Sequence, residues 1–397
     1  EPVAYSGTDR NFYDRYFFNG YAPDGSGFFA LAFGVYPHLD VADAHFCVIR
    51  NGVQHCIHAS RELGIERMEL VVGPITIEVL EPLNRIRLTI AETDGIAGEF
   101  IFEGRAFPIE EPRFTHRIGP RTFMDYTRMT QNGRYSGWIS VNGKREELAA
   151  GTAGTRDRSW GVRPIGARDT QPMPGVAAPT FFWQWTPINL PGGSLFYHLN
   201  ANPDGTAWNT GAAWVPEGGG LEDISEGQGT LTTTLQAGSR WPETGLLELD
   251  VAGAPKSIEL AVSYRFQMRG LGYTSPDWGH GLHHGALKVG REDIALNDLD
   301  PLVPENLHVQ AICTAAMVGK LTASQLIVSL NDSNPLVLRR LIPLLEDITV
   351  SEKEVASILP TLANNQDPAV RFQLACTLGS LTGTSAETTL GELLATN

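Results

Sequence analysis

The sequence is poor in cysteine, in basic charge and in long apolar runs, and each shortage excludes a class of protein. Four cysteines among 397 residues are too few for a disulfide-stabilised scaffold. The 30 basic residues stand against 45 acidic ones, a formal net charge of −15, so we expect no nucleic acid partner. The longest apolar run, residues 28–36, falls well short of the ~20 residues of a membrane-spanning helix. With no signal-peptide pattern at its start, the chain is expected to be soluble and cytoplasmic, with no membrane span.

The signatures of several enzyme classes are also missing. The sequence contains no Gly-x-Ser-x-Gly elbow, no phosphate-binding loop, and neither the Cys-x-x-Cys nor the His-Glu-x-x-His pattern. These absences disfavour the common serine hydrolases, nucleotide-binding folds and zinc sites. We therefore expect no metal and no cofactor.

From residue 11 to about residue 299, the chain is a succession of short segments in which apolar and polar residues alternate. Gly, Pro, Asn and Asp separate these segments at intervals of roughly 8–12 residues, which predicts antiparallel strands. Long meanders of this kind close into barrels or sandwiches. A Gly/Thr-rich stretch at residues 149–161 divides the region. We expect a mainly β protein with one antiparallel barrel in residues 1–150 and a second in residues 151–330.

Two Asn-Gly pairs predict two-residue hairpin turns, because both turn positions need a positive φ. One is at residues 142–143 and the other at residues 51–52. Around the latter, the two strands place Cys47 opposite Cys56. We interpret these two as reduced core cysteines, with a cross-strand disulfide as the alternative.

The C-terminal residues 331–397 change to a helical pattern. Pro335 and Pro368 lie 33 residues apart in similar surroundings, which predicts two helical hairpins of HEAT type. Two repeats leave much of their apolar face uncovered. This α-helical tail should therefore contact the β-region, a protein partner or a second copy of the chain.

Residues 305–330, between the strands and the helices, fit two structures. Their pattern favours two strands joined at residues 319–320. The alternative is a helix that begins at a cap in residues 322–325.

The stretch GTRDRSWGVRP, residues 154–164, places Asp157 between Arg156 and Arg158 and close to Trp160. An acid flanked by guanidinium groups should have a lowered pKa and stay ionised. One interpretation is therefore a buried ion pair that fixes neighbouring strands. The other places Asp157 or Arg158 at the mouth of a cavity, with Trp160 as an apolar wall.

The stretch YTSPDWGHGLHHG, residues 273–285, combines an acid, a tryptophan and three histidines. If a strand runs from Gly281 onward, alternation places His280 and His284 on one face and His283 on the other. Two histidines without a carboxylate or thiolate at ligand spacing are too few for zinc. They are either structural or act as acid–base groups in a pocket.

These two stretches occur together with PENLHVQ at residues 304–310. In this combination the sequence resembles uncharacterised bacterial proteins built as two consecutive lipocalin-like barrels, which are distantly similar to carotenoid 1,2-hydratase and AttH-like proteins. The resemblance covers roughly residues 10–330. Ser275 departs from the pattern, because a ring-bearing residue is expected before Pro276, and the helical tail is extra.

The resemblance implies a calycin-type double barrel with a cavity for an apolar, isoprenoid-like or polyketide-like molecule. Relatives in that wider group add water to isolated double bonds, or cyclise them, by acid catalysis. Such catalysis needs a desolvated acid and an aromatic wall that stabilises a carbocation. The catalytic candidates are Asp277, His280 and Asp157, with Asp125 as a further acid. The substrate-binding candidates are Trp160, Trp183, Trp185, Trp278, His284, Tyr126 and Arg158.

Two functions of different classes follow. One is a cofactor-free lyase of the hydratase type, or a cyclase, that acts on a hydrophobic small molecule. The other is a non-catalytic carrier of such a molecule. A buried carboxyl group with a raised pKa would favour the enzyme, whereas Asp157 and Asp277 fully paired with arginine and backbone would favour the carrier.

Overall fold

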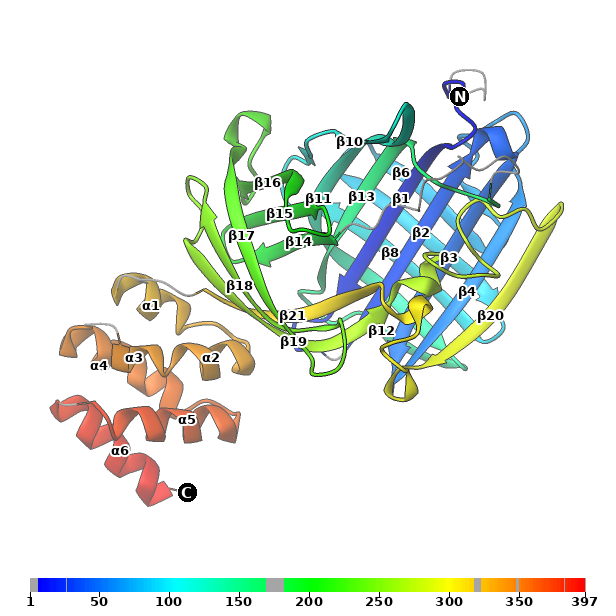
Figure 1. Ribbon diagram of the computed structural model, residues 1–397. Coiled ribbons are helices and arrows are strands. Elements are labelled where there is room, and N and C mark those ends of the chain that lie inside the picture. Colours follow the sequence, from blue (N-terminus) through cyan, green and yellow to red (C-terminus); the bar gives the residue numbers. More distant parts are fainter. Residues whose placement is uncertain are drawn as a thin grey trace. The chain divides into compact units, whose positions relative to one another are not determined.

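A computed structural model of the protein describes residues 6–25, 27–168, 182–317, 323–347, 350–381 and 383–396. The chain forms two compact units, Glu1–Ala315 and Ala316–Asn397. The first contains the β-sheets and the second contains the helices (Figure 1). None of the helices in the described ranges combines the length and the apolar character that a membrane crossing requires.

The first unit is built around a 14-stranded antiparallel sheet. Its main strands follow the order β20-β4-β3-β2-β1-β13-β11-β8-β7-β6-β5, while β9, β10 and β12 pair with β11. The sheet curves round an apolar core in which Phe18, Phe33 and Phe100 are fully buried (Figure 1). Its strands are β1 Phe12–Tyr21, β2 Phe28–Tyr36, β3 Val41–Arg50, β4 Val53–Glu62, β5 Val71–Val72, β6 Ile75–Glu81, β7 Arg85–Thr93, β8 Ile96–Gly104, β9 Ile109–Glu110, β10 Phe114–Ile118, β11 Arg121–Val141, β12 Lys144–Glu147, β13 Ala153–Val162 and β20 Leu287–Ala295.

A second, seven-stranded sheet packs against the outer face of the first. Because strand side chains alternate, Phe17 of β1 points away from the first core, into a cluster with Phe266 of β19 and Ile312 of β21. The expected mainly β fold with two barrel-like antiparallel sheets is confirmed. The strands of the second sheet, in the order in which they pair, are β14 Phe182–Leu190, β15 Gly193–Ala201, β16 Ala207–Pro216, β17 Ser225–Leu235, β18 Pro242–Asp250, β19 Ser257–Gln267 and β21 Val309–Met317.

The two predicted hairpin turns are confirmed. Asn51 and Gly52 have φ values of 51° and 76°, and the pair at residues 142–143 has values of 50° and 79°. The first turn sets β3 against β4 so that Cys47 faces Cys56. Both cysteines are fully buried and free, in agreement with the interpretation as reduced core residues.

The first sheet takes strands from both sides of residue 150. β13 inserts between β1 and β11, and β20 extends the edge at β4. Sequence position alone therefore does not assign a strand to a sheet. The division of the β-region at residues 150 and 151 stays a prediction.

The second unit is a small group of helices, as expected for the C-terminal residues. Ser351 and Glu354 form the reciprocal capping box that begins α4, and Asp367 caps α5. Whether this tail belongs to the HEAT type stays a prediction. The helices are α1 Ala323–Ser329, α2 Pro335–Leu341, α3 Leu344–Asp347, α4 Glu352–Ala363, α5 Pro368–Leu378 and α6 Thr384–Thr396.

Two local predictions were wrong. In residues 305–330 the first arm is the strand β21, but the second arm is the helix α1; the expected turn at residues 319–320 lies outside the described residues. The stretch from Gly281 onward is a loop, and the strand begins only at Leu287. Gly281 has a φ of 71°, a left-handed conformation that ends an extended segment.

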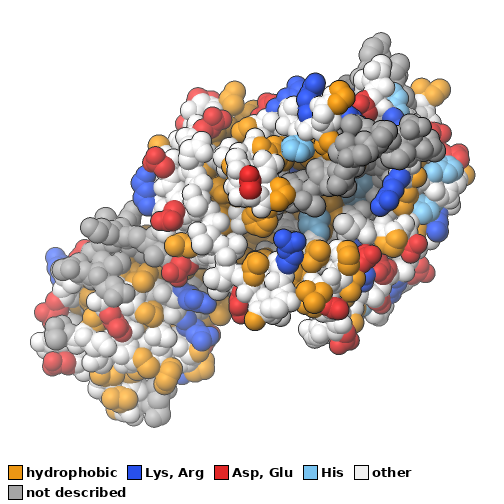
Figure 2. Space-filling view, in the orientation of Figure 1, with side chains coloured by type: hydrophobic (Ala, Val, Ile, Leu, Met, Phe, Trp, Pro, Cys, Tyr) orange, Lys and Arg blue, Asp and Glu red, His pale blue; other side chains and the backbone are white. Residues whose placement is uncertain are grey.

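Charges of both signs are mixed on one face of the molecule. Figure 2 shows Lys and Arg side chains interspersed with Asp and Glu side chains over the described part of one face. Among the described residues of this face, the basic side chains do not form the continuous stripe that follows a nucleic acid backbone.

Candidate functional site

The candidate site lies on the outer face of three neighbouring strands, β1, β13 and β11. The register of these strands aligns their outward-facing residues in rows. Cross-strand neighbours have Cβ atoms about 4.5–5.5 Å apart, so Asp157 stands between an aromatic ring and a hydroxyl group, one row from two guanidinium groups. Three successive rows are Tyr13–Gly161–Tyr126, Arg15–Ser159–Arg128 and Phe17–Asp157–Thr130.

A glycine at the centre of the first row lets two tyrosines meet. Gly161 of β13 lies between Tyr13 of β1 and Tyr126 of β11. A Cβ atom at Gly161 would lie 2.3 Å from the carbonyl oxygen of Asp125. Because this position carries no side chain, the two tyrosine rings approach edge to face with centroids 6.0 Å apart, although β1 and β11 are not adjacent strands.

A second glycine brings together charged groups in the same way. Gly34 of β2 lies between Arg15 of β1 and Asp43 of β3. The Arg15 guanidinium donates to the Tyr36 hydroxyl at 3.1 Å, and this hydroxyl donates to Asp43 at 3.2 Å. Burial by itself raises the pKa of Asp43, but hydrogen bonding from His45 and the charge of Arg15 lower it below the ordinary value. Asp43 is therefore an ionised partner of Arg15.

Asp157 differs from the other acids of this face. In the described part of the chain, its carboxyl group has no hydrogen bond and no ion pair. The side chain keeps part of its surface accessible, yet it lies deep among protein atoms. This burial raises its pKa to about 7, opposed by the charge of Arg128 and reinforced by that of Glu111. Near neutral pH, Asp157 is therefore present in both protonation states.

The neighbouring acid, Glu111, is fully bonded. It accepts hydrogen bonds from the Arg128 guanidinium at 2.5 and 2.9 Å, from the Thr130 hydroxyl at 2.6 Å and from the Trp185 indole at 3.0 Å. Burial by itself raises the pKa of Glu111, but the charge of Arg128 lowers it below the ordinary value. The charge of Arg128 is thus balanced within the site.

Aromatic rings border the acid on the side of the second sheet. The Arg128 guanidinium lies 4.9 to 5.4 Å from the ring centroids of Phe114, Trp183 and Trp185. Trp185 also meets Phe17 edge to face, with centroids 5.6 Å apart. Phe17 is the cross-strand neighbour of Asp157, so Phe17 and Trp185 lie beside this residue, and the rings of Phe114 and Trp183 lie against Arg128, one row away.

A histidine links the end of β13 to the same face. Arg163 donates to Nδ1 of His280 at 2.8 Å, and Nε2 of His280 lies 3.0 Å from the carbonyl oxygen of Leu271. That oxygen also accepts a hydrogen bond from Arg15 at 2.6 Å. Burial, together with the charges of Arg15 and Arg163, lowers the pKa of His280 well below its ordinary value. His280 is therefore neutral, with its proton on Nε2.

Several residues predicted from the sequence lie together. Trp183 and Trp185 share a face of β14 and both contact Arg128, one row from Asp157. Tyr126 stacks on Phe114 with centroids 4.6 Å apart. His280 belongs to the same layer through its bond with Arg163.

The expected ion pair between Asp157 and its flanking arginines was wrong. Alternation directs Arg156 and Arg158 to the opposite face of β13 from Asp157. There Arg156 donates to Gln131 at 2.7 Å, and Arg158 donates to both carboxylate oxygens of Asp14 at 3.0 and 2.7 Å. The pKa of Asp157 is accordingly raised rather than lowered.

Four other predicted residues lie apart from Asp157. Trp160 is 40% exposed and shares the face of Arg158. Asp277 is exposed in the loop before β20. Trp278 stacks on His58 with centroids 5.1 Å apart and meets His284 at 4.8 Å, and these rings cover β4 and β20.

Sequence reasoning missed several functional candidates on this face. Two of them, Arg163 and Tyr273, lie inside the motifs quoted above, where the histidines and tryptophans drew attention away from them. Arg15 is a charged residue in the otherwise largely apolar strand FYDRYFFNGY, a sign that was available in the sequence. The missed residues are Tyr13, Arg15, Asp43, Glu111, Arg128, Arg163 and Tyr273.

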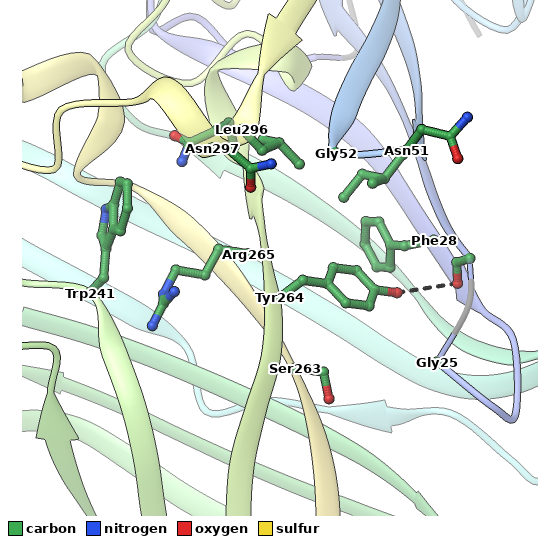
Figure 3. Close-up of a pocket in the computed structure, with 13 residues that line it drawn as sticks. Gly25, Phe28, Asn51, Gly52, Trp241, Ser263, Tyr264, Arg265, Leu296 and Asn297 are labelled. Carbon is green, nitrogen blue, oxygen red and sulfur yellow. Dashed lines mark hydrogen bonds between the residues drawn. The ribbon is translucent and has the colours of Figure 1, made fainter.

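The described residues contain no group of three or more His, Cys, Asp or Glu side chains placed to hold a metal ion. A pocket of about 370 Å³ opens elsewhere, between β2, β3 and β19. Figure 3 shows Phe28, Trp241, Tyr264 and Arg265 in its lining, with the Tyr264 hydroxyl donating to the Gly27 carbonyl at 3.2 Å. This described lining has no carboxylate and no imidazole, so the pocket is separate from the acid at Asp157.

The fold and the site define a two-sheet antiparallel β protein in which one acid beside aromatic rings has no bond to the described residues. A family model described as a family of unknown function (DUF8625) matches residues 1–328, and the chain belongs to this family. No curated protein matches the chain.

Three solved structures are similar to this chain. An AttH-like protein from Nitrosomonas europaea is 16% identical, with 68% of this chain and 86% of that chain covered and a TM-score of 0.43. Kievitone hydratase from Nectria haematococca is 11% identical, with coverage of 66% and 79% and a TM-score of 0.37. CghA with Sch210972 is 12% identical, with coverage of 65% and 77% and a TM-score of 0.40. At these values the likeness carries no argument about chemistry.

Proposed function

We propose that the protein is a cofactor-free lyase of the hydratase type, or a cyclase, that acts by acid–base catalysis on a hydrophobic small molecule. The observation that carries the proposal is the state of Asp157: an accessible carboxyl group that is unbonded within the described chain, with a pKa raised to about 7. An acid with a pKa near the working pH transfers protons efficiently. A structural acid would be paired, as Glu111 is with Arg128.

In the proposed reaction, protonated Asp157 gives its proton to one carbon of a substrate double bond. The π electrons form the new C–H bond, and the neighbouring carbon becomes a carbocation. In a hydratase, water adds to this carbon and its surplus proton passes to the Asp157 carboxylate. In a cyclase, a second double bond attacks instead, and the proton lost afterwards goes to the same carboxylate. The acid is regenerated, and neither route needs an oxidant or a reductant.

The aromatic residues beside Asp157 are suited to the two other tasks of this reaction. The rings of Trp183 and Trp185, which keep part of their surface accessible, offer apolar surface to the substrate and electron-rich faces to a carbocation. Arg128 lies among these rings, but Glu111 balances its charge. His280 is assigned a positioning role, because it contacts Arg163 and the Leu271 carbonyl.

A carrier function is supported less well by the same observations. The carrier was expected to have its aspartates paired with arginine, and Asp157 is unbonded among the described residues. The two functions differ in one measurable respect. An enzyme loses turnover but keeps ligand binding when its acid is replaced, whereas a carrier has no turnover to lose.

The test uses a panel of isoprenoid and polyketide alkenes incubated with the full chain in D₂O. We expect a product that carries one deuterium from the solvent at the protonated carbon. Asp157→Asn should abolish turnover while quenching of tryptophan fluorescence still reports ligand binding. The control is Asp125→Asn, which removes an acid bonded to Arg113 at 2.6 and 2.9 Å and should leave turnover unchanged. A product without deuterium, or an Asp157→Asn variant that remains active, would refute the proposal.

A further inference from the structure

Arg163 is the unusual cation of this face. It follows directly after β13, and its guanidinium lies 4.4 Å from the ring centroid of Tyr13 and 5.6 Å from that of Tyr273. Its hydrogen bond goes to a neutral partner, Nδ1 of His280. Arg163 and Tyr273 each keep part of their surface accessible, whereas Tyr13 is fully buried.

The charges of the face do not balance at Arg163. Arg15 lies 3.9 Å from the Asp43 carboxylate, and Arg128 lies 2.5 Å from that of Glu111. Arg163 has no ion pair in the described chain. A guanidinium group that is largely removed from water and has no counter-charge is unfavourable unless an anion completes the site.

We propose that Arg163 binds an anionic oxygen of the substrate, a carboxylate or an enolate, between the rings of Tyr13 and Tyr273. The substrate of the site is then an amphiphilic acid with an apolar, unsaturated body. The anion site at Arg163 is independent of the proposed function. Only the placement of the apolar body of the substrate beside Asp157 rests on that function. A planar guanidinium forms two parallel hydrogen bonds to a carboxylate, and the flanking rings limit its freedom to turn.

The anion would also correct a weakness of the acid-catalysed route. An unbalanced cation repels a carbocation that develops in the same low-dielectric layer. A substrate oxygen bound to Arg163 cancels this charge. It also opposes ionisation of Asp157. The charges of Arg128, Arg15 and Arg163 favour the ionised carboxylate, whereas the charge of Glu111 favours the protonated form. Cancelling the charge of Arg163 therefore favours the protonated acid. The substrate would thus keep its own acid protonated.

The test compares two probes of nearly equal shape, 2-naphthoate and neutral 2-naphthamide, by titration calorimetry on the full chain. At pH 6 we expect wild type to prefer 2-naphthoate at least about tenfold, the scale of one charge-assisted contact. Arg163→Met should abolish the preference and Arg163→Lys should retain part of it. The control, Arg113→Met, removes the same charge from an exposed pair with Asp125 and should keep the preference.

A second readout uses the coupling to Asp157. In wild type the affinity for 2-naphthoate should fall as pH rises through about 7, because ionised Asp157 then competes for the cations. In Asp157→Asn this fall should vanish and the preference should remain. Equal affinity of wild type for the two probes, or binding of neither, would overturn the inference. Retained turnover in Asp157→Asn together with an intact preference would refute the proposed function and leave the anion site standing.

Discussion

Replacing Asp157 by asparagine should make the protein increasingly stable relative to wild type as the pH rises. Replacing an acid that is held in a structural ion pair would have the opposite effect. The pKa of this carboxyl group is raised from 3.8 to about 7 in the folded chain. The folded state therefore binds the proton more tightly than the unfolded state. This contribution to stability is complete below the unfolded pKa and is lost as pH rises through the folded pKa.

The size of the effect follows from the shift. One pKa unit corresponds to about 1.36 kcal/mol, and the unfolded carboxyl group ionises before the folded one. Between pH 5 and pH 8 the loss is about 2–3 kcal/mol of unfolding free energy. An asparagine side chain at this position would carry no such loss, so Asp157→Asn should gain about 2–3 kcal/mol relative to wild type over this interval. Taking the difference between two pH values cancels any pH-independent effect of the substitution.

The assay is urea unfolding followed by tryptophan fluorescence at pH 5 and pH 8. All eight tryptophans precede residue 316, so the signal reports on the β unit, Glu1–Ala315. The control is Asp125→Asn. The bond with Arg113 lowers the pKa of Asp125, so that acid is ionised at both pH values and its replacement should show no pH trend. A stability difference between wild type and Asp157→Asn that is equal at pH 5 and pH 8 would refute the reasoning.

Two further substitutions probe the surroundings of Asp157. Glu111→Gln should lower the free energy of unfolding by about 3–5 kcal/mol, because it breaks a buried pair and leaves Arg128 unbalanced. Turnover should fall as the pH rises and Asp157 loses its proton. In Glu111→Gln this fall should occur at lower pH, since the charge of Glu111 raises the pKa of Asp157; a fall at the same pH as in wild type would contradict this electrostatic account. Gly34→Ala sets a Cβ 2.2 Å from the Tyr36 hydroxyl and should cost about 1–3 kcal/mol in urea unfolding. Its control, Gly27→Ala, lies in the same unit and sets a Cβ 3.2 Å from the flexible end of the Arg50 side chain, and an equal effect of the two changes would exclude the steric cause.

The strands and the turns could be predicted from the sequence because they depend on neighbouring residues. Alternation and the Asn-Gly pairs are local signals, and the structure bears both out. The row that contains Asp157 is not local. It joins Phe17 in β1, Asp157 in β13 and Thr130 in β11, and it exists only because β13 inserts between strands that are distant in sequence. The residue spacing within a single sequence motif therefore cannot predict this pairing.

The histidine-rich loop shows a different limit. Its residues alternate as a strand would, but Gly272 and Gly281 have φ values of 85° and 71°, left-handed values that are typical of turns and loops. The bend directs the amide of Gly281 to Asp43 at 2.8 Å and brings His280 to Arg163. Long-range hydrogen bonds therefore override the local pattern, and the partners that decide this lie more than 100 residues away.

The stretch RDRSW, residues 156–160, directs side chains into two different layers of the protein. On the side of the first core, Arg156 and Arg158 bond to Gln131 and Asp14 and so tie β13 to its neighbours. On the other side, the single residue between them carries an acid that is unbonded within the described chain. Had the arginines shared its face, their charges would have lowered the pKa of Asp157 and left it ionised. Alternation keeps them structural, and it thereby leaves Asp157 able to hold a proton near neutral pH.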